Sequence, residues 1–189
     1  MNDLGVQDRV EIEWQPFELN PDMPAEGENV REHITRKYGS TPEEGKRTEE
    51  SITELGAELD FRFDFFNKMR IVNTRDAHIL LEYAKDFGKQ TELKMRLFDA
   101  YFNQRKDISD RRILLQELKH VGLSSDDALL RLENDEVRER VKTTEAYWHS
   151  LGVSAVPTMV FNRASAVTGA QPVEVYKQVL TELINPGHL

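Results

Sequence analysis

A proline stands at the entrance of the strand that the sequence predicts near the end of the chain. The segment GVSAVPTMVF (152–161) has the apolar, β-branched composition of a buried strand. Pro157 removes a backbone donor where a sheet would use one. A four-residue turn, a second strand over 166–168 and an amphipathic helix over 172–184 follow. This order predicts a β-β-α unit whose entry carries the proline.

A long helical block precedes this unit. The segment RVEIEWQPF (9–17) alternates apolar and polar residues, which predicts a half-buried strand. Between residues 30 and 151 apolar residues recur at helical spacing, and the run from Thr41 to Glu44 has the capping-box pattern of a helix start. The sequence therefore predicts an α/β protein with a strand, an all-helical insertion and the β-β-α unit.

Composition excludes several classes of protein. The chain has 189 residues, 39% of them hydrophobic and 31% charged, which is typical of globular proteins in water. A net charge of −9 argues against nucleic acid as a partner. No apolar run approaches the roughly 20 residues of a membrane span, so we expect no membrane partner. The opening MNDLGVQDRV lacks the apolar core of a secretory signal, and we expect a cytoplasmic location.

The chain contains no cysteine. Disulfides, thiolate metal ligands and thiol nucleophiles are therefore excluded for this polypeptide. The five histidines are scattered, without the spacing of metal ligands, and we expect no metal site.

Five segments, in this order and spacing, resemble the DsbA family. They also resemble, more narrowly, its FrnE-like branch, which is kin to the 2-hydroxychromene-2-carboxylate isomerases and kappa-class glutathione transferases. The segments are EWQPFELNPDMP (13–24), VNTRDAH (72–78), FDAYF (98–102), LGVSAVPTMVF (151–161) and VTGAQP (167–172). The resemblance implies a thioredoxin-like, DsbA-type sheet with an inserted all-helical domain, and membership of a family of protein-disulfide oxidoreductases.

The resemblance also implies that part of the usual fold is missing. In the family, a first strand and a helix that carries the Cys-x-x-Cys or Ser turn precede the strand matched here by 9–17. We therefore expect an incomplete thioredoxin-like domain over 1–29 and 152–189, with the first strand and first helix missing. Residues 30–151 would form the helical insertion and the return helix. Two sheet edges would remain unpaired. A second copy could pair them in a dimer, the 9–17 strand could lie elsewhere, or the sequence could be a fragment of a longer protein; of these we expect a homodimer.

The resemblance implies a binding site at Val156 and Pro157. In this fold the peptide bond before the proline is cis, and the preceding main chain is left free for an extended peptide or for glutathione to bind by strand addition. The alternative is a trans proline that starts an edge strand. Because thiol–disulfide exchange needs a thiolate, we expect no catalytic residue and no intrinsic dithiol activity in this chain.

The remaining candidates for substrate binding are Asn20, Asn73, His78, Gly169, Ala170 and Gln171. Asn20 is a turn former whose loop the resemblance places beside the site. Asn73 either caps the next helix or contacts substrate, and His78 is either packed or a general base. The stretch from Gly169 to Gln171 is either a tight turn or a helix start whose amides hold the γ-glutamyl carboxylate of glutathione.

We therefore expect a DsbA/FrnE-like protein whose partner is a thiol or disulfide protein, or a glutathione-like small molecule. No cofactor is expected, with glutathione as the exception in one alternative. That alternative is a glutathione-dependent isomerase or transferase relative. The other alternative is a non-catalytic, dimeric module that binds peptides.

Overall fold

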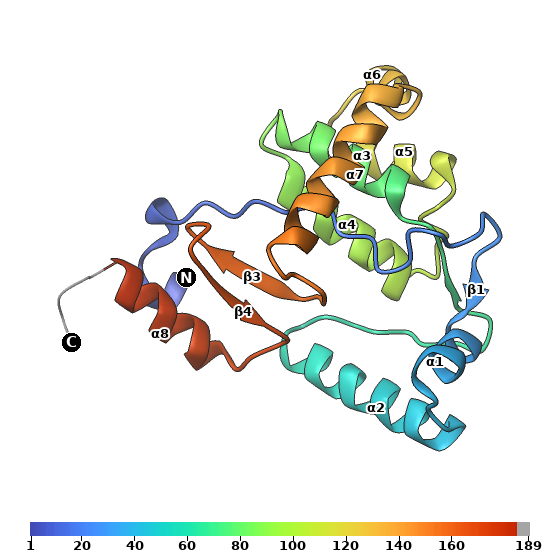
Figure 1. Ribbon diagram of the computed structural model, residues 1–189, viewed down its shortest axis with the longest axis horizontal. Coiled ribbons are helices and arrows are strands. Elements are labelled where there is room, and N and C mark those ends of the chain that lie inside the picture. Colours follow the sequence, from blue (N-terminus) through green and yellow to red (C-terminus); the bar gives the residue numbers. More distant parts are fainter. Residues whose placement is uncertain (185–189) are drawn as a thin grey trace. The chain divides into compact units, whose positions relative to one another are not determined.

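The computed structural model describes residues 1–184. Eight α-helices and four strands follow one another in this part of the chain, after two short 3-10 helices (Figure 1). The elements are η1 (Asn2–Leu4), η2 (Gln7–Arg9), β1 (Glu28–Asn29), α1 (Val30–Tyr38), α2 (Pro42–Glu58), β2 (Arg70–Ile71), α3 (Arg75–Lys85), α4 (Gln90–Phe102), α5 (Arg111–His120), α6 (Ser125–Leu132), α7 (Asp135–Ser150), β3 (Thr158–Phe161), β4 (Ser165–Thr168) and α8 (Val173–Ile184).

The helices lie where the periodicity of apolar residues predicts them. The capping box at the start of α2 is confirmed: Glu44 N–H donates to Thr41 Oγ1 at 3.2 Å, and Thr41 N–H donates to Glu44 Oε2 at 2.8 Å. Pro42 fills the first helical position, where no backbone donor is needed. Local sequence therefore fixes where this helix begins.

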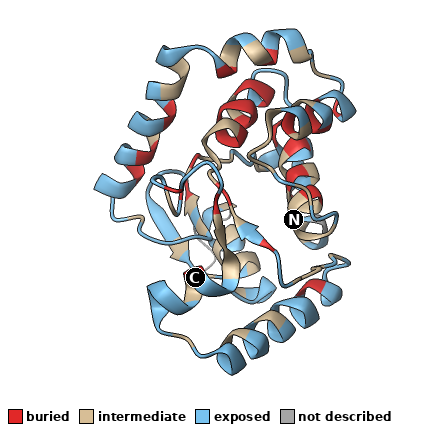
Figure 2. Cartoon of the chain, turned by 90° about the vertical axis from the view of Figure 1, so that its right-hand side faces the viewer, coloured by how far each residue is buried: buried red, intermediate tan, exposed pale blue. Residues whose placement is uncertain are grey.

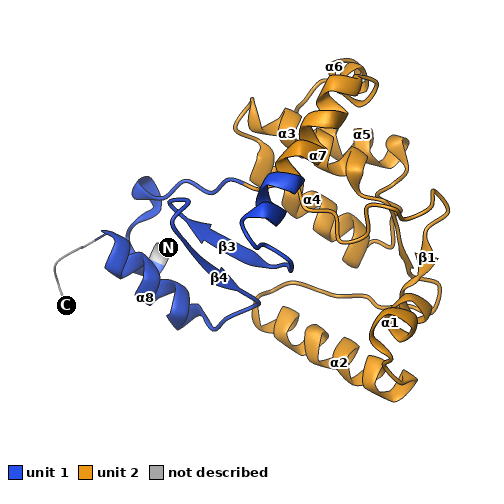
Figure 3. Ribbon diagram, in the orientation of Figure 1, with its two compact units in different colours: residues 1–13, 146–189 blue, residues 14–145 orange. Residues whose placement is uncertain are grey.

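The described chain divides into two compact units, coloured separately in Figure 3. Unit 1 comprises residues 1–13 and 146–189, and unit 2 comprises residues 14–145. The division into a domain of 1–29 with 152–189 and an insertion of 30–151 stays a prediction.

Unit 2 has a hydrophobic core made by its helices. α3 packs against α4, α5 and α6, and buried residues lie mainly on helices in Figure 2. Six fully buried large aliphatic side chains come from four different helices: Ile79, Leu80, Leu93, Leu114, Leu118 and Leu132. Each such side chain contributes roughly 1.5–3 kcal/mol on burial, so this cluster holds α3, α4, α5 and α6 together.

The strand predicted over residues 9–17 is not formed. η2 occupies Gln7–Arg9, and residues 10–19 belong to no strand. The side-chain amide of Gln90 takes the place of a neighbouring strand at Trp14: it accepts from Trp14 N–H at 2.9 Å and donates to Trp14 C=O at 2.8 Å. A period-two pattern shows that a segment is extended, but a strand also needs a second strand beside it.

Unit 1 contains the β-hairpin and the helix that the sequence predicts. β3 and β4 pair antiparallel, with Thr158 opposite Thr168 and Phe161 opposite Ser165. Lys177 of α8 forms an ion pair with Asp3 at 3.0 Å, which ties the start of the chain to its last helix. A second small sheet, formed by β1 and β2 in unit 2, was not predicted, because two-residue strands leave no periodic signal.

Candidate functional site

The Val156–Pro157 peptide bond lies at the mouth of the β3–β4 hairpin and is cis. The Pro157 carbonyl accepts a hydrogen bond from Gly169 N–H at 2.8 Å, so it faces the strand partner. Val156 is 45% exposed. Among the described residues, none hydrogen-bonds to the Val156 amide or carbonyl. The main chain before the proline therefore remains available.

The outer edge of β3 continues this available main chain. Among the described residues, β3 pairs only with β4. Main-chain groups alternate in direction along a strand, and Pro157 points its carbonyl toward β4. The N–H and C=O groups of Thr158 and Val160 therefore point to the opposite edge. Another extended segment could pair with that edge in a regular ladder.

Gly169, Ala170 and Gln171 lie in the same unit as the proline, directly after β4. Gly169 has a φ of +80°, which favours glycine. The side chain of Gln171 turns back and donates from Nε2 to the Thr168 carbonyl at 3.1 Å. Tyr176 Oη donates to the Gly169 carbonyl at 3.4 Å. This stretch is a tight turn before α8, and the hydrogen bond from Gly169 to Pro157 places it beside the hairpin mouth.

Asn20 and Asn73 lie in unit 2, and both side chains have protein partners. Asn73 Oδ1 accepts from Arg75 N–H at 3.0 Å, just before α3, although the N-cap residue itself is Thr74, and Nδ2 donates to Pro21 C=O at 3.3 Å. Asn20 Oδ1 accepts from Lys37 Nζ at 3.1 Å. These contacts order the loop after residue 19. Contact with a substrate stays a prediction for both residues.

His78 is buried on the face of α3. Burial, with a smaller contribution from the charge of Lys94, lowers its pKa to about 4, and a hydrogen bond to the Phe17 main chain opposes the shift. The ring is therefore neutral at physiological pH. This environment favours a packed histidine over a general base, which would need access to a reacting group.

A buried cluster of charged side chains in unit 2 was missed. Arg75 Nε donates to Glu18 Oε1 at 2.8 Å, and the Glu18 side chain is only 1% exposed. Glu145 Oε1 accepts from Glu18 N–H at 2.8 Å. Burial, together with the neighbouring charge of Glu18, raises the pKa of Glu145 to about 7. Glu18 and Arg75 stand in two of the segments that carry the family resemblance, but nothing in their spacing predicts that they meet.

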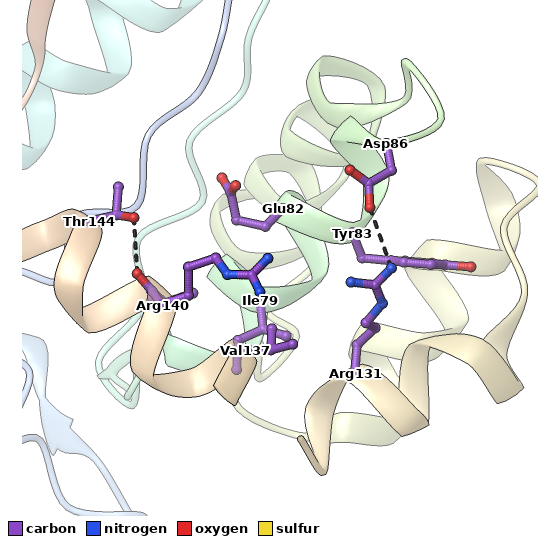
Figure 4. A pocket seen from close by; sticks show the side chains of 9 residues that line it. Ile79, Glu82, Tyr83, Asp86, Arg131, Val137, Arg140 and Thr144 are labelled. Carbon is purple, nitrogen blue, oxygen red and sulfur yellow. Dashed lines mark hydrogen bonds and ion pairs between the residues drawn. The ribbon is translucent and has the colours of Figure 1, made fainter. Parts of the chain in front are cut away.

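Neither of two hollows in unit 2 is lined by a predicted site residue. A pocket of about 70 Å³ between α3, α6 and α7 is lined by charged and apolar side chains, among them Glu82, Arg131 and Arg140 (Figure 4). It is too small for glutathione, because ligand pockets typically measure about 300–1,000 Å³. In residues 1–184 no three His, Asp or Glu side chains are grouped as metal ligands. No helix in this range is both long and apolar enough to cross a bilayer.

Comparison with known proteins places the chain in a family. The DSBA-like thioredoxin domain matches residues 2–181. The uncharacterized protein YwbO of Bacillus subtilis strain 168 is 27% identical over 177 residues, which cover 92% of this chain and 82% of YwbO.

Two crystal structures have a similar fold. SCO1869 of Streptomyces coelicolor, assigned as a DsbA oxidoreductase, matches with a TM-score of 0.86 and 27% identity over 93% of this chain and 76% of its own. A protein of Nitrosomonas europaea assigned as a protein disulfide isomerase matches with a TM-score of 0.60 and 16% identity over 82% and 88% of the two chains. The predicted thioredoxin-like fold with a helical insertion is confirmed, and the chain belongs to the DSBA-like thioredoxin domain family.

Proposed function

We propose that this protein binds an extended polypeptide by strand addition to the outer edge of β3, beside Val156 and Pro157. One observation carries the proposal: no described residue bonds to the Val156 amide or carbonyl. In strand addition the main-chain bonds supply affinity, and side-chain contacts supply selectivity. Val156 and Met159, which are both exposed, would provide apolar contacts.

The class of substrate follows from the family and from the residues present. DsbA-type oxidoreductases act on polypeptides with thiols or disulfides, so we propose a polypeptide of this kind as the ligand. The chain has no cysteine and therefore no thiolate for exchange. We expect no turnover in an insulin-reduction assay. Turnover by this chain alone would contradict the chemistry proposed here.

A pair of proline variants tests the binding edge. Val160→Pro removes an N–H from the outer edge of β3, whereas Ala166→Pro removes one from the outer edge of β4 and serves as the matched control. The probe is reduced, carboxymethylated lactalbumin, a soluble unfolded polypeptide, and the readout is the set of backbone amide shifts. We expect shifts at Val156 and Thr158 in the parent and in Ala166→Pro, but not in Val160→Pro. Unchanged shifts at Val156 in the parent would overturn the proposal.

Glutathione is a second candidate ligand. This candidate is supported by the hydrogen bond from Gly169 N–H to Pro157 C=O, because that bond holds the turn from Gly169 to Gln171 close to the Val156 main chain. The main-chain N–H groups before α8 could donate hydrogen bonds to its γ-glutamyl carboxylate. Titration with glutathione should then shift the amides of both Val156 and Gln171. A titration that leaves Gln171 unmoved removes this candidate.

A second copy of the chain could occupy the same edge. Two β3 strands could pair antiparallel about a two-fold axis and form a homodimer, which would cover both outer edges. Sedimentation velocity over a range of protein concentrations tests this arrangement. A dimer that Val160→Pro dissociates would favour it, and a monomer throughout would leave the edge to peptides.

A further inference from the structure

Helix α2 carries an apolar stripe on its outer surface. Ile52 and Leu55 of α2, and Leu59, the C-cap residue that directly follows the helix, stand at i, i+3 and i+7, which places them on one side. Their exposed fractions are 37%, 57% and 73%. Large aliphatic side chains gathered in this way on a surface mark an interaction site more often than isolated ones do.

The side of α2 directly next to the stripe holds the helix to its own unit. Gly56 is the buried residue of this helix, and a Cβ at that position would lie 2.5 Å from the Phe63 ring. Arg31 of α1 forms an ion pair with Glu49 at 2.8 Å. These contacts fix which side of α2 faces the unit. The stripe lies beside that side and faces outward, and α2, the lowest helix in Figure 2, is almost entirely exposed.

Little within the unit stabilises α2. Most helices in proteins owe their stability to a packed apolar face, and Gly45 and Gly56 each lower the helix propensity by roughly 1 kcal/mol. In α2 the large aliphatic side chains of the stripe are exposed and are not part of the contact that the helix makes with its own unit. A partner that covers them would supply the missing burial.

The charges around the stripe define the chemistry of that partner. α2 contains six glutamates and two basic residues. Glu54 and Glu58 flank the stripe in its C-terminal half, and neither forms an ion pair within residues 1–184. A second copy of α2 would bring the same excess of carboxylates and would be repelled. A partner with lysine or arginine beside its apolar residues would instead be attracted.

We propose that the stripe Ile52–Leu55–Leu59 binds an amphipathic, basic helical segment of another polypeptide. The apolar face of that segment packs on the three aliphatic side chains, with anchors at the same i, i+3, i+7 spacing. Its basic flanks lie against Glu54 and Glu58. This surface is distinct from the edge of β3, and the proposal does not depend on the function proposed above.

Two labelled peptides test the proposal by fluorescence anisotropy at low salt. One is a 14-residue amphipathic peptide of leucine and lysine, and the other has glutamate in place of every lysine. We expect the lysine peptide to bind at least about tenfold more tightly, a factor that corresponds to about 1.4 kcal/mol. Its affinity should fall as salt is added, because exposed charges are screened. Equal affinity for the two peptides, or binding of neither, would overturn the proposal.

Surface variants locate the binding. The double variant Leu55→Ser, Leu59→Ser changes only exposed side chains, so α2 should remain folded, which circular dichroism checks. We expect this double variant to bind the lysine peptide with an affinity lower by about tenfold or more. Leu130→Ser changes a similarly exposed leucine on α6, 67% exposed, and should leave the affinity unchanged. Equal losses in both variants would show that the stripe is not the site.

Charge reversal tests the role of the glutamates. Glu54→Lys with Glu58→Lys should reverse the preference, so that the glutamate peptide binds more tightly than the lysine peptide. Glu139→Lys, on the exposed face of α7, should keep the original preference. Val160→Pro should bind the lysine peptide normally, which separates this surface from the edge of β3. An unchanged preference after the double reversal would contradict the proposal.

Discussion

The carboxylate of Glu145 accepts a hydrogen bond from the main-chain N–H of Glu18 at 2.8 Å, while the carboxylate of Glu18 lies buried close by. Two acidic side chains thus share a site with one guanidinium, that of Arg75. Arg75 compensates Glu18 directly. Glu145 remains without a cation of its own, and burial together with the charge of Glu18 raises its pKa to about 7.

The raised pKa of Glu145 predicts that stability depends on pH. The ordinary value is 4.5 and the folded value is about 7. The folded state therefore holds the proton more tightly than the unfolded state. The resulting contribution to the free energy of unfolding is complete below pH 4.5 and is lost as pH rises through 7. Between these two pH values, the free energy of unfolding falls by at most about 1.4 kcal/mol per pH unit. Glu145→Gln keeps the acceptor oxygen for Glu18 and should flatten the slope, as measured by urea unfolding from pH 5 to 8.

Glu139→Gln is the matched control for this measurement. Glu139 also lies on α7, but its side chain is 71% exposed. The control should show the same pH dependence as the parent. If Glu145→Gln follows the parent as well, Glu145 does not titrate as described.

Removal of Arg75 should destabilise unit 2 strongly. Arg75→Met leaves the buried carboxylate of Glu18 without its cation, a loss that typically costs about 3–5 kcal/mol. The double variant Glu18→Gln, Arg75→Met removes both charges and should recover part of this loss. Urea unfolding of the parent, both single variants and the double variant gives the coupling energy. A coupling energy near zero would mean that the two groups do not stabilise each other.

Gln90 should control the local stability of the chain at Trp14. Gln90→Leu leaves the part-buried N–H and C=O of Trp14 without their protein partners, which costs at most roughly 1–3 kcal/mol for each group. We expect faster hydrogen exchange at the Trp14 amide. Thr91→Val, which removes only the partner of the Trp14 indole, is the control and should leave that amide protected. Equal exchange rates in all three proteins would exclude this role for Gln90.

Two glycines of α2 should respond to alanine in opposite directions. At Gly45 a Cβ meets nothing within 4 Å, so Gly45→Ala should stabilise the protein by roughly 0.5–1 kcal/mol. At Gly56 a Cβ would lie 2.5 Å from the Phe63 ring and 2.6 Å from the Phe61 carbonyl. Gly56→Ala should therefore destabilise it. Thermal unfolding of the two variants checks the signs, and a stabilised Gly56→Ala would show that α2 is not packed as described.

Local patterns predicted most of the elements. The capping box at Thr41 marked the start of α2, and the apolar run after Pro157 marked β3, because both signals depend only on neighbours along the chain. The segment 9–17 shows the limit of such signals. Its alternation predicted a strand, but its main chain at Trp14 pairs with the side chain of Gln90, 76 residues away in sequence. No local pattern contains that partner.

The candidate site divides in the same way. Val156, Pro157 and the turn from Gly169 to Gln171 were predicted, and the hairpin brings them together because its register is set by a short turn. The cluster of Glu18, Arg75 and Glu145 was missed. Its members come from three distant segments, and the pKa of Glu145 depends on burial, which exists only once the chain is packed.

The sequence by itself determined the order of helices, the β-hairpin, the absence of a thiolate and the family. Each of these depends on residue identity or on spacing along the chain. The tertiary structure alone decided which main-chain groups stay unpaired at Val156, which carboxylates meet in the interior of unit 2, and which apolar residues of α2 remain outside. These properties depend on what lies next to each group in space. Hydrogen bonding, charge interaction and burial all act between groups that are close in the folded protein, even where they are far apart in sequence.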